Sequence, residues 1–557
     1  MLSFQRSGSI IDILNRRILQ GTVVVTDGVI SDIREHEVDN NEFILPGFVD
    51  AHVHIESSML SPSGFASLAL PHGTIATVSD PHEIANVCGV DGVKWMMNDA
   101  ERVPLHVCFG APSCVPATSF ETAGAELDAT HIAELLRDPR IGYLSEMMNF
   151  PGVLYGDAKV SSILEVARAS GKPIDGHAPG VRGEAARAYA AAGITTDHEC
   201  TTLEEALEKI SYGMSILIRE GSAAKNFDAL HSLISSHPQH VMLCSDDKHP
   251  DALVQGHINV LVRRAMECGH SLFDVLRVAC VNPVLHYGLP VGLLRIGDRA
   301  DFIVMDSVES GSVKETFVHG VCVARDGAVL FAVDPPTPIN TWFDRQLRSE
   351  DFYVPALSNT IRVIDVADGQ LTTGELVLPA PVVDNALVSD TSRDVLKLVV
   401  VNRYANTPPA VAFVRNMGLR HGALASSVAH DSHNVIAVGV HDDDIVRAVN
   451  AVFEWKGGCV AVSGDERFLL PLPVGGLMSI DEPHRVAAAY EEVDAAAKRM
   501  GSTLQAPLMT LSFLALLVIP SLKLGDRGLF DIRDLTFRSL FVDTQELQSQ
   551  PNHPLSA

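Results

Sequence analysis

The stretch FVDAHVHIES, residues 48–57, ends an apolar run with two histidines that stand two positions apart, His52 and His54. Side chains alternate between the two faces of a β-strand, so both imidazoles point the same way. Two imidazoles on one face suit a metal ion, although a His-x-His pair also arises by chance. The role of this stretch must therefore be inferred from the rest of the sequence.

Seven further stretches follow the same plan, beginning with apolar residues and ending in polar, glycine or proline residues. Helix-like segments, such as residues 158–170, 183–193 and 202–213, lie between several of them. Strands alternating with helices over about 240 residues are typical of an α/β fold, the (β/α)8 TIM-type barrel, whose strand ends carry the functional site. We expect the eight barrel strands within residues 48–57, 74–83, 105–114, 141–150, 172–180, 193–200, 214–222 and 240–250.

Short β segments punctuated by glycine and aspartate flank the barrel region on both sides. Residues 21–35 alternate around an Asp-Gly pair, which is typical of a hairpin. We expect residues 1–46 and 290–340 to form one small composite β domain, with the barrel over residues 47–289. Beyond this region strands and helices mix, which predicts a separate C-terminal α+β domain over residues 345–557.

The composition argues against several classes of function. The 557 residues include 42 Lys and Arg against 69 Asp and Glu, a net charge of −27. Without a basic run such a chain would repel a phosphate backbone, so we expect no nucleic-acid binding. The most apolar run, residues 511–520, is too short to cross a bilayer, and the N-terminus lacks a signal-peptide core. Nine cysteines without a Cys-x-x-Cys pair indicate reduced thiols, so we expect a cytoplasmic protein without membrane association.

The polar residues at the predicted strand ends form a possible ligand set for metal ions. Four histidines and two carboxylates would meet at one rim of the barrel. This set suits two divalent metal ions that share a bridging carboxylate. Nitrogen and oxygen ligands without a thiolate favour Mn, Fe or Zn chemistry over a structural zinc site. The six candidates are His52, His54, Glu146, His177, His198 and Asp246.

Several motifs resemble a known family. The stretch PGFVDAHVHIESS, residues 46–58, resembles the signature of the amidohydrolase superfamily. The stretches SDPHEIANV, DGHAPG and CSDDKHP are similar to those of the bacterial adenine deaminase family. The C-terminal stretches SSVAHDSHNVIAVG, PVGGLMS and LVIPSLKL resemble the same family's extra domain. The resemblance covers nearly the whole chain.

This resemblance implies a metal-dependent hydrolase of purine salvage or adenine catabolism, which converts adenine to hypoxanthine and ammonia. It implies that His52 and His54 hold one metal ion and that His177 and His198 hold another. Glu146 takes the place of the carboxylated lysine that bridges the metals in many superfamily members. The resemblance also implies two divalent ions, with Mn or Fe expected and Zn possible.

The resemblance further suggests how the reaction proceeds. Water activated by two cations attacks C6 of adenine, and Asp246 acts as general base that passes a proton toward the leaving amino group. We expect Glu83 to donate a proton or to contact a ring nitrogen, which would require a raised pKa. His82, Asn86, Ser113 and Asn149 lie near strand ends and are candidate purine contacts. For each of these four, a structural role remains an alternative, and His82 could also be a metal ligand.

Two other readings remain open. The first is another enzyme of the same barrel, either a cyclic amidase or an N-acyl sugar deacetylase; a missing strand-four lysine argues against the amidase. The second is a non-catalytic scaffold on the same barrel, against which the filled ligand positions argue. We expect the protein to be a homo-oligomer, the common state of soluble enzymes.

Overall fold

The computed structural model describes residues 3–222, 224–358, 360–379 and 381–542. The chain divides into two compact units. Unit 1 comprises Met1–Val115, Ala125–Ile339 and Met478–Ala487, and unit 2 comprises Pro116–Gly124, Asn340–Leu477 and Ala488–Ala557. The predicted domain limits, which differ in detail from these units, stay a prediction.

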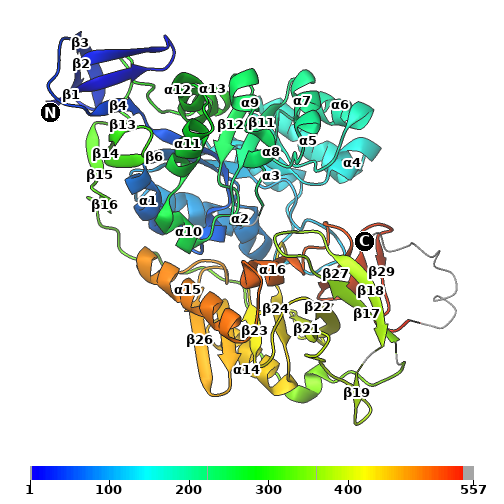
Figure 1. The fold of residues 1–557 in the computed structure, drawn as a ribbon. Helices are drawn as coiled ribbons and strands as arrows, with labels where there is room; N and C mark the ends of the chain where they lie inside the picture. The colour runs from blue at the N-terminus through cyan, green and yellow to red at the C-terminus, as the bar shows by residue number, and fades with distance from the viewer. Residues whose placement is uncertain (1–2, 223, 359, 380, 543–557) are drawn as a thin grey trace. The chain divides into compact units, whose positions relative to one another are not determined.

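Eight parallel strands of unit 1 form a closed barrel with helices around it (Figure 1). The first five and the last three pair in chain order, and Thr195 N donates to Ile174 O to join the two sets. Asp246 N donates to His52 O at 2.9 Å and His54 N donates to Asp246 O at 3.3 Å, which joins the last strand to the first. The strands are β5 (Phe48–Val53), β6 (Thr74–Ser79), β7 (His106–Ala111), β8 (Ile141–Met147), β9 (Ile174–Gly176), β10 (Thr196–Asp197), β11 (Ser215–Arg219) and β12 (Val241–Cys244).

The predicted TIM-type barrel is thus confirmed, and each strand lies within the stretch expected for it. Parallel strands are covered on both faces, which explains why residues such as those of β6 are buried throughout. The covering helices are amphipathic. In α5 (Ala158–Ser170), for example, Asp157 caps the N-terminus and Val160, Ile163 and Leu164 are buried.

The remaining helices of unit 1 follow the strands in order. They are α1 (Pro62–Ala69), α2 (His82–Ala100), α3 (Ala129–Arg137), α4 (Phe150–Tyr155), α6 (Gly183–Ala191), α7 (Leu203–Ser211), α8 (Phe227–Leu230), α9 (Leu233–Ser236), α10 (Pro250–Gln255), α11 (Ile258–Glu267), α12 (Leu272–Leu276) and α13 (Asn282–Tyr287).

An eight-stranded sheet in unit 1 combines the segments before and after the barrel. Its centre is the antiparallel pair β4–β13, in which Pro46 lies opposite Phe302. The predicted hairpin is present: Thr26 pairs with Val29, and Asp27 and Gly28 both have positive φ, as a type I′ turn requires. The strands are β1 (Ser3–Asp12), β2 (Arg17–Thr26), β3 (Val29–Glu35), β4 (Phe43–Pro46), β13 (Phe302–Ser307), β14 (Ser312–Val318), β15 (Val321–Arg325) and β16 (Ala328–Val329).

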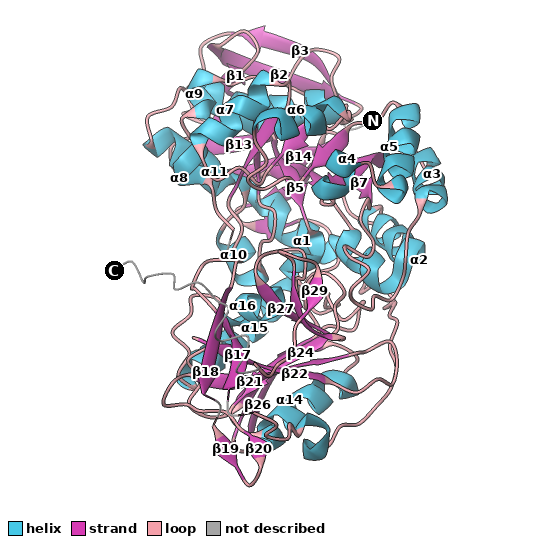
Figure 2. Cartoon of the chain, turned by 90° about the vertical axis from the view of Figure 1, so that its right-hand side faces the viewer, coloured by secondary structure: helices cyan, strands magenta, loops and turns pink. Residues whose placement is uncertain are grey.

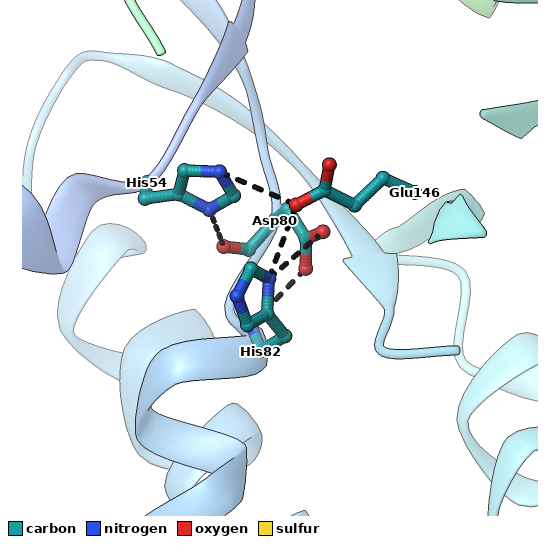
Figure 3. Close-up of side chains that lie close together, drawn as sticks. All are labelled: His54, Asp80, His82 and Glu146. Atoms are coloured by element: carbon teal, nitrogen blue, oxygen red, sulfur yellow. Dashed lines mark hydrogen bonds and ion pairs between the residues drawn. The ribbon is translucent and has the colours of Figure 1, made fainter. Parts of the chain in front are cut away.

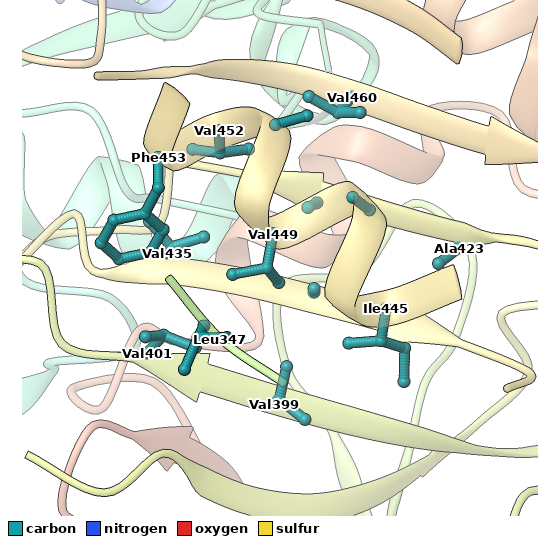
Figure 4. Packing of buried hydrophobic residues seen from close by; sticks show 14 of the residues in the cluster. Leu347, Val399, Val401, Ala423, Val435, Ile445, Val449, Val452, Phe453 and Val460 are labelled. Carbon is teal, nitrogen blue, oxygen red and sulfur yellow. The ribbon is translucent and has the colours of Figure 1, made fainter. Parts of the chain in front are cut away.

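Unit 2 contains a second eight-stranded sheet, drawn in magenta in Figure 2. Helix α14 (Asp442–Glu454) packs Ile445, Val449 and Phe453 against the buried valines of the central strands (Figure 4). The sheet strands are β17 (Thr360–Asp365), β18 (Gly374–Pro379), β21 (Val395–Val401), β22 (Ala410–Arg415), β23 (Ala423–Ser426), β24 (Val435–Gly439), β25 (Gly458–Ser463) and β26 (Glu466–Pro471).

The C-terminal region also contains short strands and two α-helices. They are β19 (Val382–Val383), β20 (Ala386–Leu387), β27 (Leu522–Gly525), β28 (Gly528–Asp531), β29 (Thr536–Phe537), α15 (Pro483–Arg499) and α16 (Pro507–Phe513). Within the described part of the chain, every helix is too short or too polar to span a bilayer.

Candidate active site

Polar side chains gather at the carboxyl ends of the barrel strands, and a repeated local turn presents several of them. In each turn an aspartate side chain accepts a hydrogen bond from the backbone N–H two residues further on. Asp50 accepts from His52 at 3.3 Å, Asp80 from His82 at 3.0 Å, and Asp197 from Glu199 at 2.7 Å. Such contacts fix the direction of the residue that follows; those of Asp80 and Asp197 lie where β6 and β10 end, whereas that of Asp50 lies within β5.

Glu146, near the end of β8, lies at the centre of the histidine cluster. Its oxygen Oε1 is 3.5 Å from His54 Nε2. Its other oxygen, Oε2, is 2.7 Å from His177 Nδ1 and 3.1 Å from His198 Nε2. One carboxylate therefore faces the histidine of the first strand with one oxygen and the histidines that follow β9 and β10 with the other.

Asp246 follows β12 and joins the same cluster. Its Oδ1 lies 3.3 Å from His54 Nε2 and 3.7 Å from His52 Nε2. The rings of His52 and His198 stack with centroids 4.2 Å apart. The neighbouring Asp247 instead accepts a hydrogen bond from Ser57. The structure thus brings all six predicted ligand candidates to one place.

The pKa values of the cluster follow from burial and opposing charge. Burial and the charge of His198 lower the pKa of His52 to about 3, so this imidazole is neutral. Burial would raise the pKa of Asp246, but the charge of Arg219 holds it well below its usual range. Burial likewise opposes ionisation of Glu146, yet His177 and His198 keep its pKa well below normal.

These residues fit divalent metal ions. Both ring nitrogens of His52 are buried without a hydrogen-bond partner among the described residues, and an orphaned neutral imidazole is a typical metal ligand. Among the groups of side chains whose donor atoms lie within 4.8 Å of one another are His52, His54 and Asp246, and His52, Glu146 and His198. All the donors are nitrogen or oxygen atoms, which suits Mn, Fe or Zn.

Buried polar contacts behind the cluster hold its strands in place. Asp50 on β5 accepts from Ser245 N at 3.0 Å and lies 2.8 Å from His257 Nε2. His257 Nδ1 lies 2.8 Å from the hydroxyl of Thr74 on β6. These contacts connect the first strand to the last strand and the second, so they orient His52 and Asp246 from behind.

A buried lysine supports the two histidines that follow β9 and β10. Lys209 Nζ donates to Ala178 O at 2.7 Å and to the carboxylates of Asp197 and Glu205 at 3.0 and 2.8 Å. Ala178 follows His177, and Asp197 precedes His198. Lys209 therefore holds the backbone carbonyl that follows His177 and the side chain of the residue that precedes His198.

His82 and Glu83 begin helix α2 beside the cluster. Figure 3 shows the imidazoles of His54 and His82 beside the Glu146 carboxylate; both approach Oε1, and His82 Nδ1 lies 3.5 Å from it. His82 Nδ1 is also 3.2 Å from Asp80, and its Nε2 is 3.5 Å from Glu83. Both residues are buried.

The other predicted purine contacts make hydrogen bonds within the protein. Asn86 Nδ2 donates to His82 O at 2.9 Å, and its Oδ1 is buried without a partner among the described residues. Ser113 donates to Glu146 O at 2.5 Å. Asn149 accepts from Gly152 N at 2.9 Å and so caps helix α4. Their roles as purine contacts stay predictions.

Sequence reasoning missed three buried residues of this site, Asp80, Glu199 and Arg219. Asp80 joins His54, His82 and Glu146 in one group of close donor atoms. Glu199 Oε1 lies 3.5 Å from both His177 Nδ1 and His198 Nε2. Asp80 and Glu199 belong to the aspartate turns described above. Both stand close in the sequence to a predicted site residue, and this proximity could have identified them.

Comparison with known proteins identifies the relatives of this chain. Residues 43–323 match the model of the amidohydrolase family, and residues 370–536 match that of the adenine deaminase C-terminal domain. An adenine deaminase of Salinibacter ruber is 54% identical over 97% of this chain and 99% of its own length. An adenine deaminase of Methanosarcina barkeri is 52% identical over 96% of this chain and 99% of its own length.

Proposed function

Because the chain belongs to the adenine deaminase family, with an amidohydrolase barrel that implies divalent metal ions, we propose that it hydrolyses adenine to hypoxanthine and ammonia with two such ions. The observation that carries the two-ion site is the position of Glu146, whose two oxygens face different histidines. His52, His54 and Asp246 would hold one ion, and His177 and His198 the other, with Glu146 between them.

Bound divalent cations supply the Lewis acidity that lowers the pKa of a water molecule. Asp246 accepts a proton from that water through Oδ1, the oxygen that faces His52 and His54. The water oxygen then bonds to C6 of adenine, and Asp246 returns the proton to the amino group. The C6–N bond breaks and ammonia leaves. The proton that remains on the new C6 oxygen is released and replaces the one that the ring nitrogen takes up, so adenine and water give hypoxanthine and ammonia.

Negative charge would build on the purine ring during attack, so the ring nitrogens need a hydrogen-bond donor. Glu83 is buried at the start of α2, next to His82, and supplies the ring-nitrogen proton in this proposal. His82, Asn86, Ser113 and Asn149 complete the purine contacts. Oxygen and imidazole ligands without thiolate favour Mn or Fe, with Zn as the alternative.

We also infer a cytoplasmic homo-oligomer. All nine cysteines are free thiols, as is usual in a reducing compartment. Closed homo-oligomers are the common state of soluble enzymes.

A substrate panel tests the proposed reaction. The Mn-loaded protein and its Asp246→Asn variant are given adenine, adenosine, a cyclic imide and an N-acetyl amino sugar, and ammonia, ring opening and acetate are measured. We expect ammonia from adenine alone and a loss of at least about 100-fold in the variant, because a general base contributes 10²–10⁴-fold. Turnover of the imide or the amino sugar in place of adenine would refute the proposal.

A further inference from the structure

Arg219, the last residue of β11, connects two carboxylates at the rim of the barrel. Its Nη1 donates to Asp246 Oδ2 at 2.6 Å, and its Nη2 donates to Glu199 Oε2 at 2.9 Å. Nη1 also contacts Glu199 Oε1. All three side chains are buried, so water screens these contacts little. The guanidinium therefore forms one fork between the end of β12 and the end of β10.

This fork makes the two oxygens of Asp246 different. Oδ2 lies on the guanidinium, whereas Oδ1 faces His52 and His54. The backbone of Asp246 is already fixed, because its N–H and its carbonyl bond to the first strand. The side-chain carboxylate could still rotate, and the hydrogen bond from Arg219 prevents this rotation.

Arg219 is itself held by the neighbouring loop. Its backbone N–H donates to Asn226 Oδ1 at 2.8 Å. Asn226 Nδ2 donates to the carbonyls of His198 and Cys200 at 3.0 and 3.1 Å, on either side of Glu199. The arginine backbone and the glutamate backbone are thus tied to the same amide side chain. A rigid support of this kind is what an orienting residue requires.

From this geometry we propose that Arg219, paired with Glu199, is a positioning residue that aims Oδ1 of Asp246 at the site of reaction. The inference rests on the proposed function of Asp246. A lysine could not replace the arginine fully, because an ammonium is a point charge while the planar guanidinium presents several donors in fixed directions. Glu199 keeps the second arm of the fork occupied, and its own Oε1 lies beside His177 and His198.

The variants Arg219→Gln, Arg219→Lys and Glu199→Gln test the proposal, with Arg264→Gln as the matched control. Arg264 pairs with Glu220, the residue after Arg219, and with Asp228 of α8, and neither carboxylate contacts Asp246 or Glu199 in the fork. For each variant kcat and KM on adenine, the Mn²⁺ dissociation constant and the melting temperature are measured. We expect Arg219→Gln to lower kcat about 100-fold with KM changed less than about threefold, because positioning acts on the chemical step.

Arg219→Lys should recover part of this loss, and Glu199→Gln should lose less than Arg219→Gln because Arg219 still holds Asp246. Arg264→Gln should match the unmodified chain. A normal kcat in a folded, metal-loaded Arg219→Gln protein would overturn the proposal. So would a raised KM with unchanged kcat, which would make Arg219 a substrate contact.

Mn²⁺ affinity separates positioning from a simple charge effect and does not depend on adenine. If Arg219 were only a counter-charge, its removal would leave more negative charge in the cluster and would tighten Mn²⁺ binding. A positioning role predicts about tenfold weaker binding, because an orienting contact to a metal ligand is lost. Tighter binding would overturn the proposal. If the unmodified chain does not deaminate adenine, the proposed function fails while this affinity comparison still tests Arg219.

Discussion

Glu146 Oε2 lies 2.7 Å from His177 Nδ1, although the two residues come from different strand ends, β8 and the loop after β9. The other oxygen of the same carboxylate faces His54, from the end of β5. The contact therefore connects two halves of the histidine cluster through one side chain. Such a carboxylate is suited to bridge two cations.

Replacing Glu146 by glutamine should remove the carboxylate that would bridge the two ions, while the side-chain volume stays the same. We expect Glu146→Gln to bind about one Mn²⁺ per chain at saturation and to lose at least about 100-fold in kcat/KM, because a direct ligand matters at least as much as its supporting contacts. Elemental analysis and ammonia release measure both effects. The matched control is Glu134→Gln, an exposed residue of α3 that pairs with Lys94. Full occupancy and activity in Glu146→Gln would contradict the bridging role.

The joint between β9 and β10 leaves no room for a side chain at Gly176. A Cβ there would meet the backbone carbonyl of Thr196 and would lie 2.7 Å from Ile194. Because backbone cannot move aside cheaply, we expect Gly176→Ala to lower the free energy of unfolding by about 1–3 kcal/mol. Gly64→Ala, where the nearest atom is 3.4 Å away, is the control and should be neutral or slightly stabilising. Calorimetry compares the two, and equal melting temperatures would refute the expectation.

Lys523 in unit 2 is a buried lysine whose ammonium is hydrogen-bonded to carbonyls of Leu371 and Phe513, at 2.7 and 2.9 Å. Burial lowers its pKa to about 7 from 10.5. Above pH 7 the folded chain releases this proton while the unfolded chain keeps it up to about pH 10. The unfolded state then binds more protons, so this group makes stability rise with pH between about 7 and 10, by at most about 1.4 kcal/mol per pH unit.

The variant Lys523→Met should lack this dependence. Its stability relative to the unmodified chain should be greatest near pH 7 and should fall as the pH rises toward 10. Urea unfolding in a Trp95→Phe background measures this, because the two other tryptophans, Trp342 and Trp455, both lie in unit 2. A difference between the two chains that stays constant with pH would show that Lys523 is charged throughout.

Arg403 is a fully buried arginine of unit 2 that satisfies several carbonyl groups. It donates to Gly475 O at 2.7 Å and to Asn340 Oδ1 at 2.9 Å, and its guanidinium lies 4.4 Å from the ring centroid of Trp342. Arg403→Met would take this donor from the buried carbonyl of Gly475 and from the half-buried Asn340, so we expect a loss of about 3 kcal/mol or more. Arg447→Met, at an exposed arginine of α14, should change stability by less than about 0.5 kcal/mol. A similar effect of both changes on urea unfolding would contradict this.

The barrel was predictable because its strands and helices alternate in the sequence. The eight apolar runs ending in polar residues match the observed strands, and residues 158–170 coincide with α5. Parallel strands carry their chemistry at one end, so the six ligand candidates could be found from the strand order alone. The positions of these six residues follow from the alternation of strands and helices, which is visible in a single sequence.

Arg219 and Glu199 could not be identified in the same way. Nothing in the sequence distinguishes Arg219 from any other polar residue at the end of an apolar strand. Its partners Glu199 and Asp246 lie 20 and 27 positions away along the chain. Their contact arises only when β10, β11 and β12 lie side by side. Asn149 was singled out from the sequence, but its role could not be predicted. An asparagine at a strand end is equally suited to contact a ligand or to cap the next helix, and here it caps α4.

Titration of the metal-free chain with Mn²⁺, with ammonia release from adenine measured at each step, tests the central claim most directly. The account predicts almost no ammonia without metal and a rate that rises until about two Mn²⁺ are bound per chain. It also predicts hypoxanthine in equal amount to ammonia. Full activity at one Mn²⁺ per chain would contradict the two-ion site. No ammonia from a chain with two bound Mn²⁺ would contradict adenine deamination itself.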